Sequence, residues 1–201
     1  MNPAVTLPLP PDPERRTWLL ATAGAGGVAA IGAAVPLVAS LAPSERARSQ
    51  GAAVEVELGD IPPGGLKAVE WRGKPVWILR RTPQMLAALQ ALAPRLADPG
   101  SLRDAVAASL RNVTRASRPE YLVVIGICTH LGCSPNFMPE GGAHPALGDD
   151  WPGGFFCPCH GSTFDLAGRV FKNKPAPTNL EIPPHRYLGE SRLVIGETDP
   201  A

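Results

Sequence analysis

Two short segments that combine cysteine with histidine constrain this chain more than any other feature. The first is CTHLGC, residues 128–133, and the second is CPCHGS, residues 157–162. Together they hold all four cysteines of the chain and two of its four histidines. Because 26 residues separate His130 from Cys157, the segments can act together only if the fold brings them side by side.

The two segments allow three interpretations. A pair of structural disulfides would suit a secreted chain with an even number of cysteines, but it leaves the histidines unexplained. A structural zinc site with two cysteine and two histidine ligands leaves two cysteines without a role. A Rieske-type [2Fe-2S] centre takes two thiolates and two imidazoles and leaves one cysteine in each segment free to form a disulfide. We favour this third interpretation, whose ligands would be Cys128, His130, Cys157 and His160.

Mixed ligation of this kind has a chemical consequence. Thiolates suit the iron that stays ferric, whereas neutral imidazoles leave the other iron easier to reduce. Such centres therefore have potentials of about −150 to +300 mV, against about −400 mV for plant-type ferredoxins with cysteine ligands alone. The outer imidazole nitrogens can also bind or lose protons as the charge on the iron changes.

Residues 17–44 contain no charged side chain. As a helix this run would be about 42 Å long, enough to cross a hydrocarbon core of about 30 Å. We therefore predict a transmembrane anchor over residues 17–42, and a cleaved signal peptide is the alternative because Ser40-Leu41-Ala42 has the small residues that a peptidase needs. Arg15 and Arg16 resemble a twin-arginine export signal, which would place residues 1–16 in the cytoplasm.

The sequence after the predicted anchor, residues 43–201, indicates a linker followed by one soluble domain. Residues 43–53 are small and polar and predict a flexible hinge. Residues 54–201 contain most of the 24 prolines and 21 glycines, which favours short strands and turns over a helical bundle. We expect strands over residues 54–58, 69–81 (two strands around a turn) and 121–127.

Two helices are also expected in this domain. Thr82 and Pro83 predict an N-cap and first helical residue, with the helix ending at about Leu92. Ser101 and Asp104 stand at capping-box spacing and predict a second helix that ends at about residue 111.

Together these features resemble the Rieske iron–sulfur subunit of the cytochrome bc complex, ubiquinol–cytochrome c reductase, of the bacterial type. The resemblance runs from the apolar run nearly to the C-terminus and includes WRGKPVWILRRTP (71–83), GGFFCPCHGSTFDLAGRVF (153–171) and KPAPTNLEIPPH (174–185). It implies a mainly β fold: an antiparallel β-sandwich with a short helical insertion and a cluster-binding subdomain over about residues 126–178. Soluble Rieske ferredoxins and oxygenase domains generally lack both the anchor and the second cysteine pair.

The resemblance also implies a role for each residue of the two segments. Cys128 and Cys157 would bind the inner iron, and His130 and His160 the outer iron. Cys133 and Cys159 would form a disulfide between the segments. The remaining implied positions are Ser162, as hydrogen-bond donor to a bridging sulfide, and Leu131, Gly132 and Pro175 of the 174–177 loop, as the tip that docks on cytochrome b.

One position departs from the family pattern. Family members usually carry a tyrosine two residues after that serine, hydrogen-bonded to a cysteine sulfur, and here the residue is Phe164. One hydrogen bond to the cluster would be missing, so we expect a reduction potential below that of tyrosine-bearing relatives.

The implied function is electron transfer within a larger enzyme, because the subunit is not catalytic alone. It would take one electron and a proton from ubiquinol at cytochrome b, with His160 as the hydrogen-bond partner of the quinol, and pass the electron to cytochrome c1. The expected setting is a dimeric complex in a bacterial inner membrane, with the N-terminus cytoplasmic and the soluble domain periplasmic. A Rieske subunit of an arsenite-oxidase type is the alternative. A net charge of +1 gives no reason to expect a nucleic-acid partner.

Overall fold

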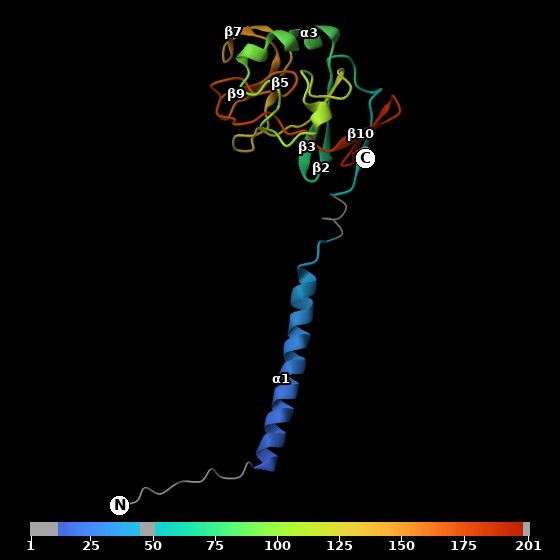
Figure 1. Cartoon of the computed structure of the whole chain (residues 1–201), viewed down its shortest axis with the longest axis vertical. Helices are drawn as coiled ribbons and strands as arrows, with labels where there is room; N and C mark the ends of the chain where they lie inside the picture. Colours follow the sequence, from blue (N-terminus) through green and yellow to red (C-terminus); the bar gives the residue numbers. More distant parts are fainter. Residues whose placement is uncertain (1–11, 45–50, 199–201) are drawn as a thin grey trace, which may run out of the picture. The chain divides into compact units, whose positions relative to one another are not determined.

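A computed structural model describes residues 12–44 and 51–198 of the chain, which divides into two units. The first unit contains helix α1 (Pro13–Ser40), drawn in blue in Figure 1. Its N-cap is Asp12, whose carboxylate accepts a hydrogen bond of 3.0 Å from the backbone N–H of Glu14. The helix is long and apolar enough to cross a membrane, and none of its residues is buried against protein.

The structure describes only part of the segments that we predicted for the N-terminal part of the chain. Arg15 and Arg16 lie in the first turn of α1, which begins at Pro13. Residues 1–11 of the N-terminal segment lie outside the described residues, and so do residues 45–50 of the predicted linker. The twin-arginine signal and the hinge therefore stay predictions.

The second unit is built from antiparallel sheets. In the part of this unit that the structure describes, three sheets have three strands each. The first sheet has the order β1 (Val54–Glu57), β11 (Arg192–Ile195), β10 (His185–Leu188). The central sheet has the order β2 (Leu66–Trp71), β3 (Lys74–Arg80), β4 (Tyr121–Ile125). The third sheet has the order β5 (Asn136–Met138), β8 (Gly154–Cys157), β9 (Ser162–Phe164).

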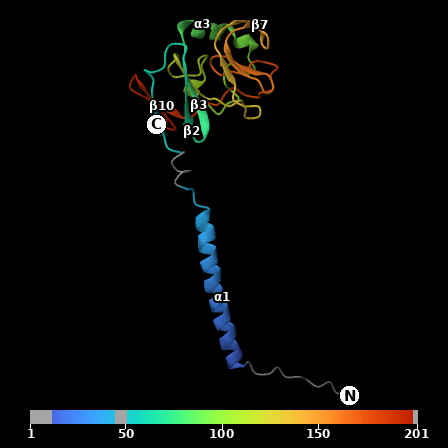
Figure 2. The same ribbon diagram turned by 180° about the vertical axis from the view of Figure 1, so that it is seen from behind.

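The other elements lie around these sheets. A hairpin of β6 (Gly142–His144) and β7 (Gly148–Trp151) follows β5. Helix α3 (Pro83–Ala91) and two 3-10 helices (Ala93–Arg95 and Ala108–Leu110) lie between β3 and β4 in the sequence. Figures 1 and 2 both show α3 and β7 at the same end of the unit, where Leu92, Leu96, Trp151 and Phe171 form a small hydrophobic cluster.

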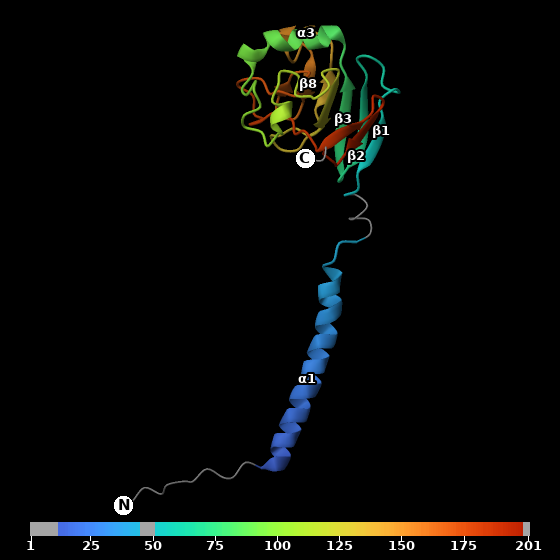
Figure 3. The same cartoon turned by 45° about the vertical axis from the view of Figure 1, so that its right-hand side comes forward.

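Strands β3 and β4 of the central sheet are covered on both faces. Alternate residues of β3 and β4 pack toward the first sheet, and these are Val76, Ile78, Tyr121, Val123 and Ile125. The residues between them pack toward the third sheet, and these are Trp77, Leu79, Leu122 and Val124. Figure 3 shows β1 and β8 on opposite sides of β3. This double burial explains why β4 is a continuous apolar run rather than an alternating one.

Most of the expected elements are present. The strand pair around the turn at residues 72–73 is formed by β2 and β3, paired from Leu66↔Leu79 to Trp71↔Lys74. Helix α3 begins where it was predicted, and the Thr82 hydroxyl accepts a hydrogen bond of 3.3 Å from the backbone N–H of Met85. The mainly β sandwich with a short helical insertion is therefore confirmed.

The second predicted helix, over residues 101–111, is wrong. Ser101 has a φ of 52°, outside the right-handed helical region, and only Ala108–Leu110 form a single 3-10 turn. The carboxylate of Asp98 accepts hydrogen bonds from the backbone N–H groups of Leu102 (3.0 Å) and Arg103 (2.9 Å), which closes a tight turn instead. Asp104 does not cap a helix, because it forms an ion pair with the buried Arg115.

The close contact between the central and third sheets yields a first prediction. A Cβ at Gly126 would overlap the indole of Trp77, which stacks on Phe155 with ring centroids 5.3 Å apart. Gly126→Ala should therefore lower the free energy of unfolding by about 3 kcal/mol. Thermal unfolding followed by circular dichroism measures this. Gly59→Ala is the matched control, because a Cβ there meets open space and the melting temperature should stay unchanged. Equal melting temperatures for the two variants would contradict the packing argument.

Candidate metal centre

The two cysteine–histidine segments form turns of the same construction. In the first, which follows β4, the backbone N–H of Gly132 donates to the carbonyl of Cys128 at 3.1 Å. In the second, which joins β8 to β9, the N–H of Gly161 donates to the carbonyl of Cys157 at 3.0 Å. Both glycines have left-handed backbones, with φ of 84° and 77°, which favours glycine at these positions. Each cysteine is thus followed, four residues later, by the glycine that closes its turn.

A disulfide joins the two turns. It links Cys133 to Cys159, whose Cα atoms lie 6.7 Å apart. The sulfur of Cys157 lies within 4.8 Å of both disulfide sulfurs, so the second turn carries a free thiol directly beside the bridge. Among the described residues the free cysteines are Cys128 and Cys157, and both are buried. The structure thus has one disulfide between the turns and leaves one free cysteine in each turn.

The four predicted ligands form two adjoining pairs, one of thiols and one of imidazoles. Burial raises the pKa of the Cys128 thiol, and the neighbouring Cys157 thiol raises it further. Hydrogen bonds from the backbone N–H of His130 and from the Ser162 hydroxyl act in the opposite direction and favour the thiolate. The rings of His130 and His160 meet edge to face, with centroids 4.7 Å apart.

One atom of this group indicates a missing partner. The Nδ1 atom of His130 is buried and has no hydrogen-bond partner among the described residues. A buried ring nitrogen left unpaired is costly, and a metal ion would satisfy it. Two buried thiols and two adjoining imidazoles are the donor set of a histidine-ligated iron–sulfur centre, so the residues present fit such a group.

The surroundings of the four residues divide into a buried and an exposed side. Ser162 is fully buried, and its hydroxyl accepts a hydrogen bond of 3.0 Å from the backbone N–H of Ala176. On the other side Leu131 is 70% exposed, although it is a large apolar residue. Gly132, Pro175 and His160 are exposed as well. The predicted docking tip is thus an apolar surface open to solvent.

Sequence reasoning missed the contacts that hold residues 174–180 beside the two turns. The hydroxyl of Thr129 donates a hydrogen bond of 2.7 Å to the carbonyl of Thr178. Farther along the segment, the side-chain oxygen of Asn179 accepts a hydrogen bond from the backbone N–H of Val170, and the buried Arg115 donates one to the carbonyl of Leu180. No local pattern indicates the contacts of Thr129 and Arg115, because their partners are 49 residues or more away in sequence.

Comparisons with known proteins show the family of the chain. The Rieske [2Fe-2S] domain family matches residues 100–184. The ubiquinol-cytochrome c reductase iron-sulfur subunit of Allochromatium vinosum is 56% identical over 184 residues, which are 92% of this chain and 88% of that protein. The mitochondrial cytochrome b-c1 complex subunit Rieske-1 of Arabidopsis thaliana is 46% identical over 145 residues, 72% of this chain and 46% of that protein. A chain of a hyperthermophilic respiratory Complex III aligns over 86% of this chain and 97% of its own, with 25% identity and a TM-score of 0.47.

The disulfide yields the second prediction. It closes a loop with a sequence separation of 26 residues, and removing it should lower the free energy of unfolding by about 3–4 kcal/mol through the entropy of the unfolded chain. The double variant Cys133→Ser and Cys159→Ser, unfolded by urea as the full chain in detergent, measures this loss. Thiol reduction of the unchanged chain is the control and should give the same loss. A change below about 1 kcal/mol in both would contradict a stabilising role.

Proposed function

The chain belongs to the family of Rieske iron–sulfur subunits of ubiquinol–cytochrome c reductase, and we propose that it carries single electrons from ubiquinol to cytochrome c1 within such a complex. The observation that carries the proposal is a pair of adjoining buried thiols, Cys128 and Cys157, in the same two turns as a pair of imidazoles that meet edge to face, one of which has a buried nitrogen without a partner. The relatives named above are subunits of the quinol complex, and none of them favours the arsenite-oxidase alternative.

The family's cofactor is one [2Fe-2S] cluster, which when bound accepts and releases one electron at a time. We assign Cys128 and Cys157 to the inner iron, and His130 and His160 to the outer iron. The Ser162 hydroxyl lies within hydrogen-bonding reach of the Cys128 sulfur and is held by the Ala176 N–H, which suits a donor to the sulfur atoms of the site. Each of these roles is a proposal for this chain.

The two histidines differ in their access to solvent. His160 is exposed, whereas His130 is partly covered and its Nδ1 is buried. The exposed ring nitrogen of His160 can accept a hydrogen bond from a quinol hydroxyl and hold the proton that leaves with the electron. We therefore assign the quinol contact to His160, with His130 as the second imidazole of the site.

The exposed tip is the surface that we assign to the partners. Leu131 and Gly132 of the first turn and Pro175 of the 174–177 loop are open to solvent, as is His160. An apolar side chain that is 70% exposed, as Leu131 is, suits a protein interface. Cytochrome b, with its bound ubiquinol, and cytochrome c1 are the proposed partners, in a complex that we propose to be dimeric by family resemblance.

A membrane setting fits the first unit. We propose that α1 crosses the inner membrane of a bacterium once, with the N-terminus in the cytoplasm and the soluble unit in the periplasm. The twin arginines at the start of α1 support this orientation, and so does the disulfide, because disulfides persist in oxidising compartments. The linker over residues 43–53 would let the soluble unit move between cytochrome b and cytochrome c1.

Electron paramagnetic resonance of the full chain in its membranes tests the proposed function. We expect a rhombic signal with an average g value below that of the free electron, produced by ascorbate alone because histidine ligation makes the potential high. Cys157→Ser should abolish the signal, whereas His144→Gln, which changes a histidine outside both turns, should leave it intact. Bound zinc without such a signal would contradict the proposal, and a signal that only dithionite produces would place the protein outside the quinol pathway.

Phe164 provides the next prediction. It is fully buried in β9, two residues after Ser162, and cannot donate a hydrogen bond. Phe164→Tyr should add a donor to a cysteine sulfur and raise the midpoint potential. A differential stabilisation of about 1 kcal/mol corresponds to roughly 40 mV for a one-electron couple. Redox titration followed by paramagnetic resonance measures the shift.

The matched control is Phe137→Tyr, a change in β5 at a partly buried ring that packs on Phe155. It adds the same hydroxyl to the third sheet and should leave the midpoint potential unchanged. An unchanged midpoint in Phe164→Tyr would contradict the assigned effect of the missing hydroxyl.

A further inference from the structure

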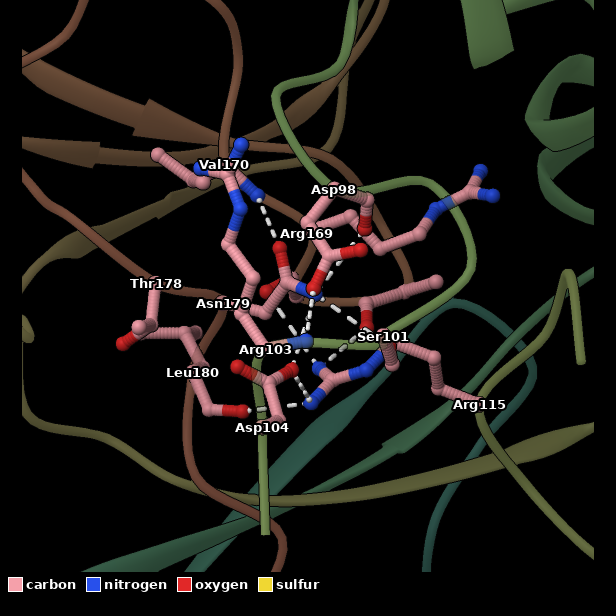
Figure 4. Close-up of polar contacts among 12 residues, drawn as sticks. Asp98, Ser101, Arg103, Asp104, Arg115, Arg169, Val170, Thr178, Asn179 and Leu180 are labelled. Carbon is pink, nitrogen blue, oxygen red and sulfur yellow. Dashed lines mark hydrogen bonds and ion pairs between the residues drawn. The ribbon is translucent and has the colours of Figure 1, made fainter. Parts of the chain in front are cut away.

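A buried polar network connects residues 98–115 with the segment 174–180 that lies beside the metal centre (Figure 4). We call it the Asp104 network, and its members are Asp98, Ser101, Asp104, Arg115 and Asn179. Four of them are at most 5% exposed, and the side chain of Asp104 is 11% exposed. The assigned function gives these residues no role.

Arg115 is the cation of the network. Its Nη2 donates to the Asp104 carboxylate at 3.1 Å and to the carbonyl of Leu180 at 2.8 Å. Its Nη1 donates to the carbonyls of Ala167 (3.0 Å) and Gly168 (3.3 Å). Burial lowers the pKa of this guanidinium, and the Asp104 carboxylate is the strongest influence in the opposite direction. Asp104 therefore compensates a buried charge that also binds the end of the 174–180 segment.

Asn179 is bound through both ends of its side-chain amide. Its oxygen accepts a hydrogen bond of 2.9 Å from the backbone N–H of Val170. Its nitrogen donates to the Asp104 carboxylate at 2.8 Å, and it also contacts the Asp98 carbonyl at 3.1 Å and the Ser101 hydroxyl at 3.2 Å. In Figure 4 the carboxylate of Asp104 lies between Asn179 and the guanidinium of Arg115. One carboxylate oxygen thus serves both neighbours.

The segment 174–180 is held from two directions. On the side of the metal centre, Ala176 binds Ser162 and Thr178 binds Thr129. At its other end the Asp104 network holds Asn179 and Leu180. A cavity of about 820 Å³ is lined by Asp104, Arg115 and Asn179 and also by Thr129 and Thr178. Thr178 and Asn179 line this cavity, and the hydrogen bonds named above are contacts that hold them in place.

We propose that Asp104 and Asn179 are positioning residues of the metal centre. Through Arg115 and the backbone of residues 179–180, they hold the segment so that the Ala176 N–H stays on the Ser162 hydroxyl. That hydroxyl is then kept directed at the Cys128 sulfur, and the buried side of the centre stays closed to water. The inference rests on the proposed function, because the position of the segment affects redox chemistry only if a cluster is bound at this site.

Hydrogen exchange of the full chain in detergent, carrying its cluster, tests the positioning directly. Asp104→Ala should speed exchange at the amides of Ala176 and Leu180 by about tenfold or more, since a charge-assisted support is lost. Asp104→Asn keeps an acceptor oxygen but loses the charge that compensates Arg115, so it should restore only part of the protection. Arg103→Ala is the matched control, because its side chain is exposed and only its backbone N–H joins the turn.

Paramagnetic resonance of the same variants reports the effect on the site. Asp104→Ala should broaden the signal and shift the midpoint potential, Asp104→Asn should do so to a smaller extent, and Arg103→Ala should do neither. If Asp104→Ala assembles no cluster, Ser101→Ala decides the question, because it removes only the hydroxyl that contacts Asn179. Ser101→Ala should also broaden the signal and shift the midpoint potential, but by less than Asp104→Ala.

Several outcomes would overturn the inference. Exchange rates and spectra equal to those of the unchanged chain would do so, and so would an equal effect of Arg103→Ala. Absence of a cluster signal from the unchanged chain would instead contradict the proposed function. The amide exchange rates would still show, without the cluster, whether Asp104 holds the segment.

Discussion

Strands β3 and β4 of the central sheet are buried on both faces, and the arrangement of the other sheets depends on this burial. Val76 and Ile78 pack toward the first sheet, while Trp77 and Leu79 pack toward the third. A sheet buried on both faces needs a protein layer on each side, so the third sheet is held against β3 and β4 by apolar contact. The first turn leaves β4 directly, and the second leaves β8. Packing between these layers therefore brings the two cysteine–histidine segments together, and the disulfide then joins turns that already adjoin.

Much of this arrangement could be predicted from local sequence signals. The two cysteine–histidine segments, the Thr82–Pro83 helix start and the apolar run of β4 each depend on neighbouring residues. The start of α1 also has local signals, namely the Asp12 cap and Pro13. The prediction began the anchor at residue 17 instead, because the uncharged run begins there. The comparisons confirm the family, whereas the individual ligand roles stay proposals.

The wrong prediction of a helix over residues 101–111 has a physical cause. Ser101 and Asp104 satisfy the spacing of a capping box, but Asp104 has stronger partners in Arg115 and Asn179. Asn179 is 75 residues away from Asp104 in sequence, so no local pattern indicates their contact. That Arg115 is buried and needs the Asp104 carboxylate is likewise visible only in the folded chain. Tertiary pairing of a buried charge is worth more than one helix cap, and the helix is lost.

The unequal exposure of the two imidazoles has a consequence for the order in which partners can bind. His160 is exposed to solvent, whereas Ser162 and Ala176 are buried on the opposite side, so we expect partners to approach the centre from the side of His160. An electron donor and an electron acceptor that both need this side have to take turns, since one excludes the other. Tight binding to either partner would then slow turnover, and moderate affinity for both would serve such a carrier best.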